Sequence, residues 1–255
     1  MKRDFWLLFL IFLSYSSLLA QSKYTKLLEK EKFSKVWKKS ELILSKNSRN
    51  IEFNFYQAYI ASESSTNQYY NLDNAFDAFC ISYDSYVRIN DFSEIEKLNK
   101  VPITLNIYDD LLSEILNRKY QEAHQSTSIT FLENFLFQYR PERLPAGKRD
   151  QLEIFRESIA RRRDNLAYST AKNAQSIKAL EEFIRRYPNA QEVESAYLLI
   201  DEIAYNIAKQ TNTVTSFKRF ISDYPDALQI EEAWKLIYNI EFSSAERFNN
   251  PRAWD

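Results

Sequence analysis

Apolar and polar positions follow helical spacing along most of the chain, and in its second half the pattern repeats at a fixed interval. The segment S-I-K-A-L-E-E-F-I-R-R-Y-P-N, residues 176–189, returns 37 residues later as T-V-T-S-F-K-R-F-I-S-D-Y-P-D, residues 213–226. A third copy, S-I-T-F-L-E-N-F-L-F-Q-Y, lies at residues 128–139. A period of about 20 to 50 residues is typical of arrays in which each unit buries its apolar face only against its neighbours.

The copies at residues 176 and 213 keep the same chemistry at matching positions. The matched pairs are Ile177 with Val214, Phe183 with Phe220, Ile184 with Ile221, Tyr187 with Tyr224, Pro188 with Pro225, and Ala190 with Ala227. A second motif recurs at the same interval, as D-N-L-A-Y-S-T-A-K from Asp164 and D-E-I-A-Y-N-I-A-K from Asp201. Two independent matches at one period argue against a chance origin.

Each unit is predicted to be a helix of about 11 residues followed by a longer helix. Ser128, Ser176 and Thr213 take the N-cap position, and Tyr-Pro ends the short helix in the last two copies. An insertion between residues 140 and 151 lengthens the first interval to 48 residues, and we expect it to form a surface loop. The predicted fold class is all-α, an α-solenoid built as a right-handed stack of antiparallel helical hairpins.

The part of the chain before these repeats is also predicted to be helical. We expect helices over residues 72–89 and 105–124. A short helix should start at Ser93, with Glu96 completing a capping box, and should stop before Pro102. No strand-like alternation is sustained anywhere in the sequence.

Two stretches resemble known helical repeats. Residues 31–60 resemble a tetratricopeptide repeat (TPR), although Glu31 replaces the usual glycine and Ser48 the usual proline. The Tyr-Pro units of residues 128–250 are similar to those of periplasmic repeat proteins, including outer-membrane assembly lipoproteins and the coordinator of the Tol-Pal system. The resemblance implies a TPR-like superhelix that binds proteins or extended peptides. The matching TPR positions are Phe33, Val36, Trp37, Ile43, Leu44, Phe53, Tyr56 and Ala58.

The first 20 residues have the order of a cleavable signal peptide. Lys2 and Arg3 precede an apolar run at residues 5–13, and Ala20 offers a small residue for cleavage before Gln21. The run is shorter than the roughly 20 residues that a membrane span needs. The expected organisation is therefore a signal peptide at 1–20, a degenerate TPR-like region at 21–125 and the Tyr-Pro repeats at 126–255, in a periplasmic or secreted protein.

Composition gives little support to catalysis or to cofactor binding. The sequence has one glycine, Gly147, although phosphate-cradling loops and tight hairpins usually need several. The net charge of −1 gives no reason to expect nucleic acid as a partner. Cys80 and His124 are the only residues of their types, so a metal cluster has no basis in the sequence. Cys80 is interpreted as a small buried residue and His124 as a solvated residue at a helix end.

One departure from the repeat suggests a binding site. Arg162 and Arg163 occupy the positions that Leu199 and Ile200 hold in the next unit and Leu236 and Ile237 in the last. Either the helix is rotated there or the slot opens to water, where paired arginines could clamp a carboxylate of a partner peptide. The alternative is a capping face between the TPR-like region and the Tyr-Pro repeats.

The end of the chain is predicted to begin a further unit. Asn250 lies 37 residues after Thr213, Pro251 follows it, and Trp254 falls at the position of Phe217. A single turn cannot cover its neighbour. We therefore expect the last full helix, from about residue 230 to 248, to expose an apolar stripe of Leu236, Ile237 and Ile240, and the sequence to be a fragment of a longer protein.

These observations predict an exported, non-catalytic scaffold or adaptor that binds a protein or peptide of the cell envelope and reaches the membrane only through that partner. No cofactor, metal or nucleic acid is expected. One alternative is the repeat arm of a larger enzyme or cell-wall-binding protein. Another is a glycan-binding module, because aromatic residues make up 15% of the chain and Tyr69 and Tyr70 are expected to be exposed.

Overall fold

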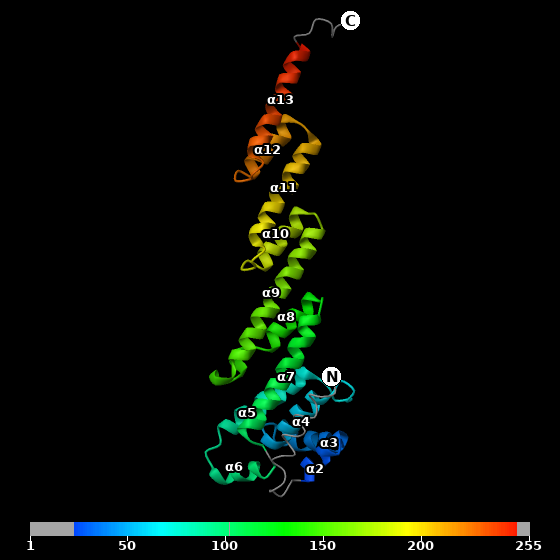
Figure 1. Cartoon of the computed structure of the whole chain (residues 1–255), viewed down its shortest axis with the longest axis vertical. Coiled ribbons are helices and arrows are strands. Elements are labelled where there is room, and N and C mark those ends of the chain that lie inside the picture. The colour runs from blue at the N-terminus through cyan, green and yellow to red at the C-terminus, as the bar shows by residue number, and fades with distance from the viewer. Residues whose placement is uncertain (1–22, 102, 249–255) are drawn as a thin grey trace. The chain divides into compact units, whose positions relative to one another are not determined.

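The computed structural model describes residues 23–101 and 103–248 (Figure 1). Within these residues it contains twelve α-helices, two short 3-10 helices and no strand, so the all-α prediction is confirmed. No helix of this part combines the length and apolar character that a membrane span requires. The signal peptide and the Asn250 to Trp254 turn lie outside the described residues.

The chain divides into two compact units. Unit 1 contains the residues up to 126 together with 134–156, and unit 2 contains residues 127–133 and those from 157 onward. Unit 1 holds α2 (Lys23–Glu29), α3 (Phe33–Leu44), α4 (Ile51–Glu63), α5 (Leu72–Val87), α6 (Phe92–Asn99), α7 (Leu105–Gln125), the end of α8 (Ile129–Gln138), the 3-10 helices η1 (Pro141–Arg143) and η2 (Ala146–Lys148), and the start of α9 (Asp150–Asn173).

Three helices of unit 1, α4, α5 and α6, start at residues whose side chains cap them. The Asn50 side chain accepts a hydrogen bond from the Phe53 amide at 3.0 Å, which starts α4 after the predicted break. The predicted cap at Ser93 is wrong, because Asp91 caps α6 by accepting from the Ser93 amide at 2.9 Å. The predicted capping box needed the Ser93 amide to donate to the Glu96 side chain. That amide donates to the Asp91 carboxylate instead.

The centre of unit 1 is an aromatic core around Tyr108 on α7. Its ring meets Phe55 of α4 and Tyr83 of α5 edge-on, with centroids 5.3 and 5.2 Å apart. Its hydroxyl lies 2.6 Å from Ser82 Oγ. Because Ser82 donates its own proton to the Ile51 carbonyl at 2.7 Å, Tyr108 is the donor of this pair. One buried chain of hydrogen bonds thus joins α7, α5 and the first residue of α4.

The helices of unit 2 recur in register. Besides the start of α8 and most of α9, unit 2 contains α10 (Ile177–Arg186), α11 (Val193–Thr211), α12 (Val214–Asp223) and α13 (Ile230–Phe248), shown in yellow to red in Figure 1. The bounds of α12 and α13 are those of α10 and α11 shifted by 37 residues, and α8 lies 48 residues before α10. Contacts join α10 to α11, α11 to α12 and α12 to α13. The predicted period is therefore also the period of the helices.

The junctions between helices repeat as well. Tyr187 and Tyr224, each before a proline, end the short helices with φ/ψ of −128°/60° and −132°/64°. Gln175 and Asn212, each before the next short helix, share a left-handed φ of 47°. Thr213 forms a capping box with Ser216, and Ser128 Oγ accepts from the Phe131 amide at 3.3 Å. Ser176 takes the N-cap position without a side-chain bond to the helix.

The core of unit 2 is built from equivalent rings. The centroids of Tyr168 and Phe183 lie 5.5 Å apart at an interplanar angle of 52°, and those of Tyr205 and Phe220 lie 5.5 Å apart at 57°. Phe183 and Phe220 are each 3% exposed, so the prediction that they are equivalent core residues is confirmed. In α9 and in α11, a tyrosine at the same repeat position therefore packs against a phenylalanine of the following short helix.

Candidate functional site

Arg163 sits on the Tyr-Pro turn of its own unit. Its guanidinium carbon lies 4.9 Å from the centroid of Tyr187, and its Nη2 lies 2.6 Å from Asp164 Oδ1. The equivalent residue Ile200 packs in a cluster that includes Tyr224, the counterpart of Tyr187. Arg163 therefore keeps the repeat contact by placing a planar cation on the ring instead of an aliphatic side chain. Its side chain is 23% exposed.

A second arginine and a glutamate complete this polar cluster. Arg186 Nη2 lies 2.9 Å from both carboxylate oxygens of Glu133, which also accepts a bond of 3.0 Å from the Tyr187 hydroxyl. Burial, and secondly Glu133, raise the pKa of Tyr187. Arg162 is half-buried and has an interaction of its own. A carboxylate ligand at Arg163 would compete with Asp164 for the guanidinium. The predicted clamp therefore stays a hypothesis, and it requires the ligand to displace Asp164 from Arg163.

The groups that could carry reaction chemistry are held by their surroundings. His124 lies near the end of α7, with its ring stacked 5.4 Å from Tyr120. Lys119 is buried, with Nζ 2.9 Å from Asp73 Oδ1 and 5.9 Å from the centroid of Tyr139. No group of three or more potential metal ligands occurs among residues 23–101 and 103–248. None of these arrangements leaves a base beside a free nucleophile.

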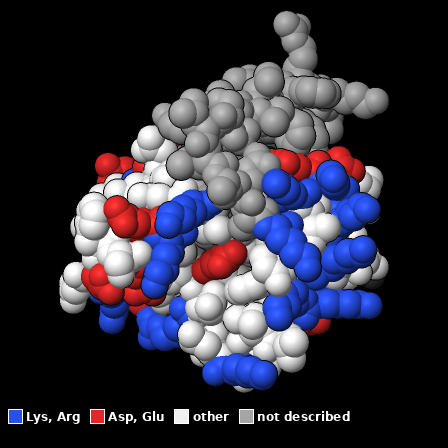
Figure 2. Space-filling view, turned by 90° about the horizontal axis from the view of Figure 1, so that it is seen from below, with Lys and Arg blue, Asp and Glu red and all other residues white. Residues whose placement is uncertain are grey.

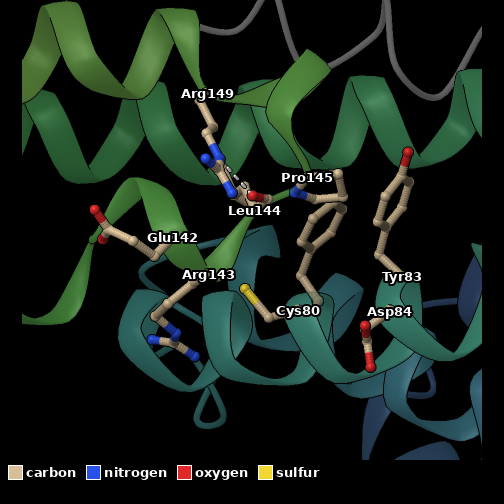
Figure 3. Close-up of a pocket in the computed structure, with 9 residues that line it drawn as sticks. Cys80, Tyr83, Asp84, Glu142, Arg143, Leu144, Pro145 and Arg149 are labelled. Atoms are coloured by element: carbon tan, nitrogen blue, oxygen red, sulfur yellow. Dashed lines mark hydrogen bonds between the residues drawn. The ribbon is translucent and has the colours of Figure 1, made fainter.

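A cavity of about 300 Å³ lies within unit 1, between α5 and the segment that carries η1 and η2 (Figure 3). The insertion between residues 140 and 151 thus folds onto α5, where Arg143 Nη2 lies 2.7 Å from Asp77 Oδ1. The lining residues are Phe79, Cys80, Tyr83 and Asp84 from α5 and Glu142, Arg143, Leu144, Pro145 and Arg149 from the segment.

The cavity has an arginine that could hold a small anion, and its thiol is not activated. Arg149 Nε donates to the Leu144 carbonyl at 2.7 Å, and in the described residues its guanidinium has no carboxylate partner. Burial raises the pKa of the Cys80 thiol to about 12, so the sulfur stays protonated near neutral pH. Asp84 is paired with Arg49 and Arg88.

The tyrosines expected to be exposed are half-buried, so that expectation is wrong. The Tyr69 ring stacks on Trp37 of α3 with centroids 4.7 Å apart and an interplanar angle of 16°. The Tyr70 hydroxyl donates to Glu122 Oε1 at 3.0 Å. Trp37 thus covers one face of the Tyr69 ring, and the Tyr70 hydroxyl is already hydrogen-bonded.

The exposed apolar stripe of α13 is not the predicted one. Ile237 is 3% exposed, and Leu236 and Ile240 pack with it against the cluster that contains Phe217 and Phe220 of α12. Among the side chains of α13 that the structure describes, the exposed rings are Trp234, Tyr238 and Phe242, with exposures of 49, 73 and 57%. They are spaced four residues apart, so they share one face of the helix. We call these three residues the aromatic ridge.

The repeat shows what covers the equivalent face of the preceding helix. Phe242 occupies the position of Tyr205 and, one unit earlier, of Tyr168, which pack against Phe220 and Phe183 of the following short helices. Tyr238 occupies the position of Asp201, whose pKa is raised by burial and by the charge of Asp226 after the next Tyr-Pro turn. The exposed face of α13 could have been found from the sequence, because the 37-residue period aligns Phe242 with Tyr205.

No family model, curated protein or solved structure matches this chain. Its function is therefore argued from the helices and side chains described above.

Proposed function

We propose that the chain is an exported, non-catalytic adaptor of the cell envelope that binds another protein through the aromatic ridge on α13. In this proposal the helical units form an α-solenoid of antiparallel hairpins. The observation that carries the proposal is the exposed ring of Phe242, since Tyr168 and Tyr205 at the same repeat position are both packed against a phenylalanine.

The partner that fits this ridge is a short amphipathic helix with aromatic residues at a spacing of three. On α12 such residues are Phe217 and Phe220, which are 0 and 3% exposed against α11 and α13. Burying a large apolar side chain contributes roughly 1.5–3 kcal/mol. Aromatic residues of this kind are common among the few that dominate binding at protein interfaces.

A helix-stapled peptide with the sequence of residues 213–226 is a suitable probe, because it is the chain's own short helix. We expect saturable binding to the full chain by fluorescence polarisation, and binding at least about tenfold weaker for Phe242→Ser. Phe92→Ser is the matched control, since Phe92 is 74% exposed on α6 of unit 1. Equal binding of the peptide and of its version with alanine at both phenylalanines would count against the proposal.

Export rests on the order of basic, apolar and small residues at the start of the sequence. Mass spectrometry of protein purified from its native cells should find Gln21 at or near the N-terminus. Intact Met1 in a cytoplasmic fraction would refute export without bearing on the ridge.

A glycan-binding module is the second candidate, favoured by one repeated feature. Tyr197 and Trp234 occupy the same repeat position on α11 and α13 and are 55 and 49% exposed. Exposed rings at a fixed interval could stack on successive sugars. A glycan array that is positive for the wild type and negative for a Tyr197→Ala, Trp234→Ala variant, with no binding of the helical peptide, would select this function over the adaptor.

A further inference from the structure

Positive charge is concentrated at the start of the described chain. Residues 23–49 contain eight lysines and one arginine against three glutamates, a local charge of +6 in a chain whose net charge is −1. The net charge of the whole chain gives no indication of this basic segment. The lysines are Lys23, Lys26, Lys30, Lys32, Lys35, Lys38, Lys39 and Lys46.

These lysines lie on α2, α3 and the residues next to them, all in unit 1. All are exposed except Lys39, which is half-buried. None of the eight forms an ion pair within the described part of the chain, whereas Arg49 is paired with Asp84. In Figure 2, Lys and Arg side chains are densest on the right of the face seen from below, and others lie elsewhere on it. The charge of this segment is thus available to a ligand.

One face of α3 also carries an exposed apolar side chain among the lysines. Lys35, Lys39 and Leu42 follow each other at spacings of four and three residues, so they form one stripe on the helix, and Lys46 follows just beyond its end. Leu42 is 52% exposed, while Val36 and Ser40, on a different face of the helix, are fully buried. A basic face beside an exposed leucine combines the two contributions to binding at a membrane surface, which are attraction to anionic lipids and burial of apolar area.

We propose that this lysine face of α2 and α3 binds anionic phospholipid membranes directly. Lysine acts as a hydrated point charge, which suits diffuse attraction to a field of headgroups better than bidentate pairing with one carboxylate. The proposal is independent of the aromatic ridge. It replaces the sequence-based expectation that the chain reaches a membrane only through a partner.

Co-sedimentation of the full chain with vesicles tests this directly. Phosphatidylcholine vesicles are compared with vesicles containing about 30% phosphatidylglycerol, at low and at high salt. We expect binding that depends on phosphatidylglycerol and falls at least about tenfold between 50 and 300 mM salt. Equal binding to both kinds of vesicle, which is the result that insertion of the apolar run at residues 5–13 alone would give, overturns the proposal.

Two sets of four substitutions separate the lysine face from overall charge. Lys35→Glu, Lys38→Glu, Lys39→Glu and Lys46→Glu together should abolish binding to the charged vesicles. The control replaces Lys172, Lys178, Lys209 and Lys218 of unit 2 by glutamate, which changes the net charge equally. Circular dichroism checks the fold of both, and Leu42→Ser, a milder change, should weaken binding several-fold. Equal binding by the two charge variants would overturn the assignment.

The same protein is tested against two other polyanions, polyglutamate and a short DNA duplex. The lipid assignment requires weaker binding to both at equal salt and equal charge concentration. Equal or tighter binding to either would show that the face recognises a different class of partner.

Discussion

Gln175 and Asn212 lie 37 residues apart and share a left-handed backbone with φ of 47°. Each links a long helix to the next short one, so the turn is a fixed part of the repeat. Asparagine tolerates this conformation better than glutamine does, and glycine adopts it without a steric cost.

The first prediction follows from this difference. Gln175→Gly should raise the free energy of unfolding by roughly 0.5–1 kcal/mol, because relief of the left-handed strain exceeds the added entropy of the unfolded chain. Asn212→Gly should change it by less. Urea unfolding measures both, and Ser176→Gly, with an ordinary φ of −130°, is the destabilising control. A loss of stability in Gln175→Gly would contradict the assigned geometry.

The second prediction concerns the repeated core. Phe183→Ala and Phe220→Ala should each lower the free energy of unfolding by about 3–5 kcal/mol, because each removes a buried ring from an equivalent cluster. Phe92→Ala, at an exposed position, should cost much less. Changes below about 1 kcal/mol at both buried positions would be incompatible with this core.

The third prediction tests the arginines of α9. Replacing Arg162 and Arg163 together by leucine, as in the next unit, should preserve or raise stability while abolishing capture of an acidic peptide. The measurements are thermal unfolding and fluorescence polarisation with a polyglutamate peptide. Unchanged capture would remove the carboxylate site. A large loss of stability would instead assign Arg163 a structural role beside Asp164 and Tyr187.

The fourth prediction uses the pKa of Glu52, which burial raises and a hydrogen bond from Tyr56 partly lowers. The folded state therefore holds the proton more tightly than the unfolded chain, whose pKa is about 4.3. The stability from this group is present below that value and is lost as the pH rises through the folded pKa. Glu52→Gln should stabilise the protein near pH 7 and leave it unchanged near pH 3.

Urea unfolding at the two pH values measures this difference. Glu202→Gln on α11 is the control, since Glu202 is exposed. An equal gain at both pH values for Glu52→Gln would show that the effect does not come from titration of the Glu52 carboxyl.

The sequence predicted the helices of unit 2 well because two motifs shared one period. The Thr213 cap starts α12, and the Tyr-Pro pairs end α10 and α12, by local chemistry alone. Local chemistry could not predict which residues, far apart in the sequence, pack against one another. Trp37 stacks on Tyr69, and Arg143 reaches Asp77 across 66 residues, so neither the burial of Tyr69 nor the cavity was visible in the pattern.

The error on α13 has the same origin. This helix carries two apolar faces, one with Ile237 and one with Tyr238, and periodicity identifies both without saying which is covered. The lysine face, in contrast, was present in the composition of residues 23–49 and was lost by averaging charge over the whole chain.

The shared bounds of the two hairpins of unit 2 bear on how the gene can change in length. Deleting residues 176–212 would join Gln175 to Thr213, so that a left-handed residue again precedes a capped short helix, as it does in the intact chain. Duplicating the same residues would likewise create only joints that the protein already contains. Recombination in whole steps of 37 codons can therefore alter the number of units without requiring a new turn, whereas any other step would put the rings of neighbouring helices out of phase.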